Sequence, residues 1–90
     1  MIGTFWKDNL GTKDLPRWRY YRVSTLADGI AEGTEVITNT AGKAVSVYMV
    51  RQLAVVLKES PMIEQITIEE ILKAGIFGLL TPVEIVKHRV

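Results

Sequence analysis

The chain has 90 residues, enough for one domain, because a chain this short buries only about 60 to 65% of its unfolded surface and cannot divide that core in two. Its 11 Lys and Arg residues nearly balance its 10 Asp and Glu residues, and the net charge of +1 excludes the strongly basic class of nucleic-acid-binding proteins. The absence of cysteine excludes disulfides, thiolate nucleophiles and zinc sites built on cysteine.

The hydrophobic fraction of 48% on so small a body predicts that some apolar surface stays exposed, which favours a partner or self-association. The N-terminal residues lack the apolar core of a signal peptide. The longest apolar stretch, residues 44–57, is interrupted by Arg51 and Gln52 and is shorter than the roughly 20 residues of a membrane span. We therefore expect an intracellular, cytoplasmic protein or one inside a virion, with no membrane span.

Residues 1–16 are predicted to form an irregular N-terminal arm, and residues 17–90 a single globular domain. The arm mixes glycine, proline, asparagine and charged residues with scattered apolar ones. Only Phe5 and Trp6 are suited to holding it against the domain.

The run RWRYYRVST at residues 17–25 predicts a strand, because aromatic and β-branched residues dominate it. Alternation places one set of side chains on one face of this strand and a second set on the other: Trp18, Tyr20, Arg22 and Ser24 against Arg19, Tyr21, Val23 and Thr25. The next segment, LADGIAEG, fits a loop or a single helical turn, and residues 34–40 predict a second short strand. We expect a β-hairpin or small sheet over about residues 17–40, with a seven-residue connection.

Residues 43–59 fit two structures, because their valines favour a strand while their length and pattern favour a helix. On a helical wheel the apolar side chains form one stripe: Val45, Met49, Val50, Leu53, Val56 and Leu57. We predict one longer helix over about residues 43–59. The rival is a hairpin that turns at Ala41 and Gly42 and returns as a strand over residues 43–50.

The C-terminal part holds two similar segments, TIEEILKA at residues 67–74 and TPVEIVKH at residues 81–88. In each, a Thr can cap a helix and a Glu three residues later completes a capping box. Pro82 suits a first helical position, and Gly75 suits a C-cap. We predict two short capped C-terminal helices, at about 68–75 and 82–89, so the expected fold class is α+β.

Two segments are candidate contact surfaces. The first is the strand of alternating Arg and aromatic residues, suited to a protein partner or to nucleic acid, with Arg17, Trp18, Arg19, Tyr20 and Arg22 as its contact residues. Because alternation divides these side chains between two faces, a structural strand with half of its aromatic residues in the core is the favoured explanation, ahead of a protein partner and then nucleic acid. The second is an apolar stretch that either completes the core or forms an interface between subunits: Ile76, Phe77, Leu79 and Leu80.

Signatures of catalysis are missing from the sequence. The lone His88 forms neither a triad nor a metal site, and a cation near a helix end explains it. Glu69 and Glu70 are explained by the start of a helix rather than by a metal. A helix-turn-helix fits poorly, because Gly29 lies inside its first helix. We expect no catalytic residue, no metal and no cofactor.

The leading interpretation is a non-catalytic interaction or assembly protein that self-associates as a homo-oligomer. A structural or accessory subunit of a virus or phage particle is one example, and a subunit of a larger intracellular complex is another. The alternative is a small nucleic-acid-binding protein or regulator that uses the strand at residues 17–23.

Overall fold

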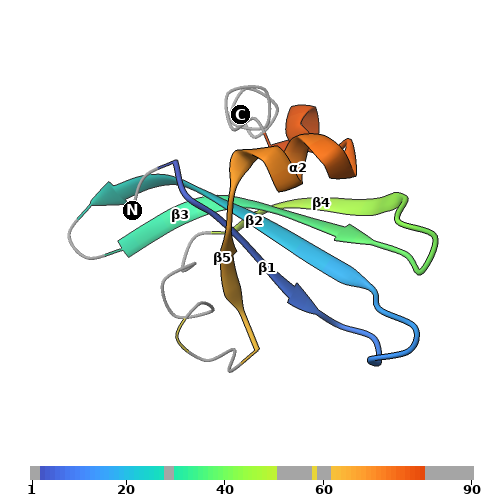
Figure 1. The fold of residues 1–90 in the computed structure, drawn as a ribbon. Helices are drawn as coiled ribbons and strands as arrows, with labels where there is room; N and C mark the ends of the chain where they lie inside the picture. The colour runs from blue at the N-terminus through green and yellow to red at the C-terminus, as the bar shows by residue number, and fades with distance from the viewer. Residues whose placement is uncertain (1–2, 28–29, 51–57, 59–61, 81–90) are drawn as a thin grey trace.

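The computed structural model describes residues 3–27, 30–50, 58 and 62–80. A five-stranded antiparallel sheet makes up most of this part of the chain, and a short helix and a 3-10 helix lie against one of its faces (Figure 1). In chain order the elements are β1 (Phe5–Asn9), β2 (Trp18–Ala27), β3 (Ile30–Thr38), β4 (Ala44–Val50), β5 (Glu64–Ile66), α2 (Ile68–Ala74) and η1 (Phe77–Leu80). The predicted α+β arrangement is therefore wrong, because the sheet dominates and extends into segments assigned to an arm and to a helix.

The first correction concerns the N-terminal arm. The strand order is β4-β3-β2-β1-β5, so β1 lies inside the sheet, between β2 and β5. Phe5 pairs with Arg22 on one side and with Ile66 on the other. Glycine and proline around this short strand suggested an irregular segment, whereas pairing with two distant strands makes it regular.

The hairpin of β2 and β3 confirms the strand that the Arg and aromatic residues predicted, but its connection is shorter than expected. Ala27 pairs with Ile30, so only Asp28 and Gly29 separate the strands, and these two residues lie outside the described part. Asp-Gly is a preferred sequence for two-residue hairpin connections. The segment expected to be a loop or helical turn therefore belongs mostly to strands.

The second hairpin overturns the helix predicted at residues 43–59 over its first half, where residues 44–50 form a strand. β4 pairs antiparallel with β3, from Thr38 with Ala44 to Gly33 with Val50, as the rival interpretation proposed. Asn39 organises the turn, because its side-chain oxygen accepts hydrogen bonds from the backbone N–H of Ala41 and of Lys43, each at 3.0 Å. Residues 51–57 and 59–61 lie outside the described part.

The first predicted C-terminal helix is present as α2. Thr67 caps it by accepting a hydrogen bond from the backbone N–H of Glu70, and Gly75 ends it in the left-handed conformation with φ of 73°. The residues assigned to the second helix, with His88, lie outside the described part. The segment between them forms η1, so residues 62–80 contain one helix and one 3-10 turn.

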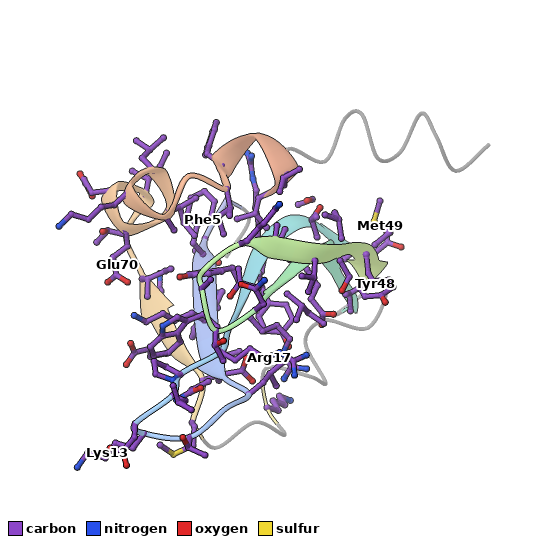
Figure 2. All side chains as sticks on the ribbon, turned by 90° about the vertical axis from the view of Figure 1, so that its right-hand side faces the viewer. Phe5, Lys13, Arg17, Tyr48, Met49 and Glu70 are labelled. Carbon is purple, nitrogen blue, oxygen red and sulfur yellow. The ribbon has the colours of Figure 1, made fainter. Side chains whose placement is uncertain are left out.

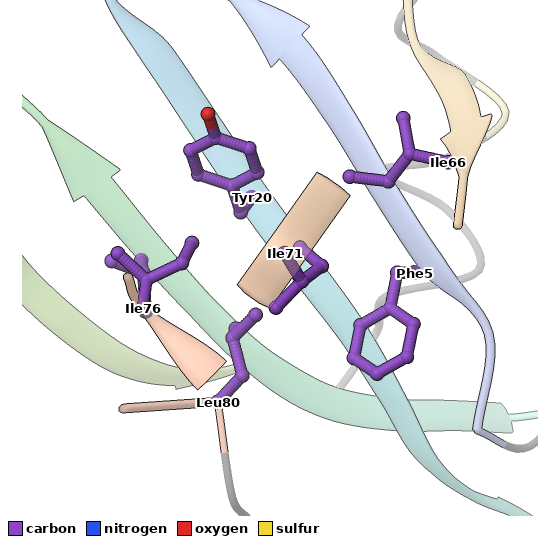
Figure 3. Close-up of a cluster of buried hydrophobic side chains, with 7 residues drawn as sticks. Phe5, Tyr20, Ile66, Ile71, Ile76 and Leu80 are labelled. Carbon is purple, nitrogen blue, oxygen red and sulfur yellow. The ribbon is translucent and has the colours of Figure 1, made fainter. Parts of the chain in front are cut away.

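The sheet buries side chains on both faces. The larger cluster lies under α2 and η1 (Figure 3) and contains Phe5, Tyr20, Val36, Ile66, Ile71, Ile76 and Leu80. The smaller cluster, on the opposite face, centres on Tyr21 and Val23, with Trp6, Val50 and Ile63 packed against it. The alternation predicted for β2 is confirmed from Trp18 to Val23, since Tyr20 and Tyr21 belong to different clusters. It does not continue to Thr25 as predicted, because the register with β3 shifts between Val23 and Thr25.

Candidate functional site

The aromatic residues of β2 are largely used by the fold. Tyr20 is buried in the larger cluster, and Trp18 is partly buried against it. The ammonium group of Lys7 lies 4.3 Å from the centre of the Trp18 ring, which gives this ring a cationic neighbour within the molecule. Burial therefore removes Tyr20 from contact with a base, whereas Trp18 is only partly buried.

Arg19 faces the other side of the sheet, where it is held by Asp8 of β1. Its Nε and one terminal nitrogen donate to the two carboxylate oxygens of Asp8, at 3.0 and 2.6 Å. Asp8 is buried, and its hydrogen bond raises the pKa of Arg19. This pair joins β1 to β2 on the face opposite α2.

Arg22 and Arg17 differ in their surroundings. The guanidinium of Arg22 lies 5.6 Å from the ring centre of Phe5 and 5.9 Å from that of Phe77, so it packs between β1 and η1. Arg17 is exposed, and its Nε donates to the backbone oxygen of Thr38. Of the five predicted contact residues only Arg17 is exposed, and nucleic-acid binding by this strand stays a prediction.

The second predicted surface, residues 76–80, is divided between core and surface. Ile76 and Leu80 are buried in the larger cluster, and Phe77 is partly buried beside Phe5. Leu79 is exposed. Most of this stretch therefore completes the core. Of the four residues predicted to form an interface, Leu79 is the one that is exposed.

The carboxylates near α2 have a partner inside the molecule. Lys7 donates to Glu70 at 2.9 Å and lies 3.6 Å from Glu64. Within the described ranges no three side chains of the kinds that bind metals gather, and no helix there is long and apolar enough to cross a membrane. The Lys7 contacts account for Glu64 and Glu70, and Glu69 lies in the first turn of α2.

Sequence reasoning missed the most exposed apolar strand, β4. It lies at one edge of the sheet, and among the described residues it pairs only with β3 (Figure 2). Val45, Val47 and Tyr48 are 57, 38 and 54% exposed. An edge strand presents a row of unpaired backbone N–H and C=O groups, and here apolar side chains flank that row.

The composition of β4 offers little protection against pairing. Its residues, AVSVYMV, include no charge and no proline, the features that commonly block edge strands. A shift in the register with β3 leaves Val45 as an extra residue, a bulge that disturbs the start of the strand. The regular part of the edge is therefore residues 46–50, which we call the open edge.

The register also assigns the side chains of the open edge to faces. Val47 and Met49 pair with Val36 and Thr34 and so lie on the face that carries α2. Tyr48 pairs with Glu35 and lies on the opposite face. A strand added here would meet apolar side chains on both faces of the sheet.

A second exposed apolar patch lies on the outer side of α2. Ile68 and Leu72, one helical turn apart, are both exposed. Unlike β4, this patch offers side chains without the row of edge backbone groups to which a strand can pair. β4 is therefore the stronger candidate for a contact surface.

We compared the chain with protein-family models, with curated proteins and with solved structures, and none of these comparisons finds a match. A function for this chain is therefore inferred from the geometry of the described residues.

Proposed function

We propose that the protein is a non-catalytic interaction protein that binds a partner by adding a strand to the open edge of β4. The observation that carries this proposal is an uncharged edge strand whose apolar side chains Val45, Val47 and Tyr48 remain exposed. Strand addition supplies affinity through main-chain hydrogen bonds and specificity through alternate side chains. β4 offers both kinds of contact.

Ion pairs within the molecule favour this choice over a binding site for a charged ligand at Lys7 or Arg19. Lys7 contacts Glu70 and Glu64, and Arg19 contacts Asp8, so these cations are neutralised within the molecule. With a net charge of +1, long-range attraction for a charged partner is weak. Backbone pairing and apolar contact are then the main sources of affinity.

A probe strand tests the proposal without knowledge of the natural partner. The probe is a synthetic peptide with the sequence of residues 44–50 flanked by lysines for solubility, added to isotope-labelled protein at low concentration. We expect chemical-shift changes and slower amide exchange confined to β4 and its neighbour β3, because new hydrogen bonds protect the open edge.

Two matched variants give this titration a control. Val47→Lys is expected to weaken probe binding about tenfold, since an edge lysine obstructs pairing. Leu72→Lys makes the same kind of change on α2, at a side chain 56% exposed, and is expected to bind the probe like the wild type. Absence of shifts on β4, or shifts centred on α2, would overturn the proposal.

A further inference from the structure

We infer that the strand which occupies the open edge is β4 of a second copy of this chain. The two strands pair antiparallel about a two-fold axis near Val47 or Tyr48, and the two sheets become one continuous sheet. This inference rests on the proposed function and names the partner. A two-fold axis perpendicular to the sheet keeps each face on its own side, so no side chain has to cross to the other face.

Charge permits this self-pairing. In a two-fold arrangement the residues near the axis meet their own copies, so a charged residue there would face a like charge. The open edge, SVYMV, carries no charge at any position. The net charge of +1 also leaves little repulsion between two whole copies.

The side chains of the open edge match across such an axis. On the face of α2, an axis at Tyr48 places Val47 against Met49 of the second copy, and an axis at Val47 places Val47 against its own copy and Met49 against Val45; each arrangement continues the apolar row. On the opposite face, an axis at Val47 places Tyr48 against Ser46 of the second copy, a large side chain against a small one. An axis at Tyr48 instead brings the two tyrosine rings together, an arrangement that aromatic pairs favour.

The other edge of the sheet is a poorer site for a second copy. β5 has only three residues, and Glu64 and Gln65 of that strand are exposed and polar. Among the described strands, β4 is therefore the edge with enough length and apolar surface for self-pairing.

The size of the contact predicts a weak dimer. A pairing over five residues a side is far below the roughly 20 to 30 residues a side of a standard interface, so we expect a dissociation constant on the order of 10 to 100 µM. The monomer of 10.1 kDa should then predominate in dilute solution and the dimer in concentrated solution.

Cysteine crosslinking tests the arrangement, because the natural chain has no cysteine and each introduced one reports alone. Single variants place cysteine at residues 46 to 50 and are oxidised at 100 to 200 µM protein, roughly the expected dissociation constant or higher. We expect disulfide-linked dimers to peak at Val47→Cys or Tyr48→Cys and to decline on either side, since only residues near the axis bring their Cα atoms within about 7 Å.

The control is Leu72→Cys, whose native side chain is 56% exposed on α2 and so reports random collision. Sedimentation equilibrium of the wild type should show mass rising with concentration toward twice that of the monomer. Val47→Lys should remain monomeric, and Leu72→Lys should associate like the wild type. Correct folding of both lysine variants is checked by the dispersion of their amide spectra.

Three results would overturn the second copy as partner. The first is a wild type that stays monomeric at about 1 mM, far above the expected dissociation constant. The second is crosslinking at residue 72 as strong as at residues 47 and 48, and the third is loss of the dimer in Leu72→Lys but not in Val47→Lys. If the chain is monomeric while the probe peptide binds β4, the partner is a different protein and strand addition stands. If the probe also fails to bind, both proposals fall.

Discussion

At the scale of single residues, ion pairs connect the strands. Asp8 and Arg19 form a two-point contact between β1 and β2 on one face of the sheet. Lys7, the preceding residue of β1, faces the other side and contacts Glu70 of α2. Neighbouring positions of one strand therefore stabilise two different layers, as the pleat requires.

Replacement of Asp8 tests the first of these contacts. Asp8→Asn keeps the size of the side chain and removes its charge, and we expect the free energy of unfolding to fall by about 2 kcal/mol, because Arg19 loses a charged partner in a buried setting. Denaturant unfolding measures this change. Asp14→Asn, on the exposed β1–β2 loop, is the matched control and should change stability by less than about 0.5 kcal/mol. Equal effects would contradict the role of Asp8.

The pH dependence of stability tests Glu35. Burial raises the pKa of Glu35, and the positive charge of Arg19 offsets this only in part. The folded protein therefore binds this proton more tightly than the unfolded chain, so the contribution of Glu35 to stability is full below its ordinary pKa of 4.5 and is lost as pH rises through the raised pKa.

We expect Glu35→Gln to gain stability relative to the wild type as pH rises from 4 to 7, because glutamine does not ionise. Denaturant midpoints of the two proteins across this range provide the measurement. A difference between them that does not vary with pH, or that grows toward low pH, would contradict the raised pKa.

At the scale of elements, the β3–β4 hairpin shows how a local pattern can fit two structures. The apolar residues at 45, 49, 50 and 53 fit a helical stripe, yet residues 44–50 form a strand. The turn before them explains this outcome, since Asn39 accepts two backbone hydrogen bonds and Gly42 adopts a φ of 82°. That turn brings β4 alongside β3, whose backbone groups then pair with it.

Gly42→Ala tests the turn. A positive φ disfavours any side chain, and nothing lies within 4 Å of the position that the new methyl group would take, so the cost is conformational and about 1 kcal/mol. Thermal or denaturant unfolding measures it. Gly78→Ala is the control, because its surroundings are equally open and its φ is not in the left-handed region. A loss at residue 78 as large as at residue 42 would argue against conformational strain.

At the scale of the whole molecule, α2 is held by packing. A helix of seven residues is not stable in isolation, because helix propensity alone does not offset the cost of forming so few turns. The burial of its side chain against the sheet must therefore supply the stability. Ile71 is fully buried among Phe5, Tyr20 and Leu80 (Figure 3). The adjacent Leu72 is 56% exposed.

Two substitutions on α2 separate packing from propensity. Ile71→Ala should lower the free energy of unfolding by about 2 to 4 kcal/mol, because it leaves a cavity between the helix and the sheet. Leu72→Ala removes a side chain of the same size at an exposed position and should change stability by less than about 0.5 kcal/mol. Denaturant unfolding of both variants gives the comparison, and similar losses would mean that α2 does not cover the core as described.

The sequence by itself determined features that short-range chemistry controls. Alternation predicted the two faces of β2 from Trp18 to Val23, and Thr67 with Gly75 predicted the start and end of α2. Each of these signals involves residues within a few positions of one another. They require no knowledge of what lies across the sheet.

Only the tertiary structure decided that residues 5–9 are an inner strand, that residues 44–50 are a strand rather than a helix, and that this strand lies at an edge. Phe5 and Ile66 are neighbours in space but far apart in the chain. Hydrogen bonds of a sheet are made between segments, so strand order and the exposed edge follow from pairing that no local pattern specifies. The open edge of β4, on which the proposed function depends, exists for that reason only in the folded chain.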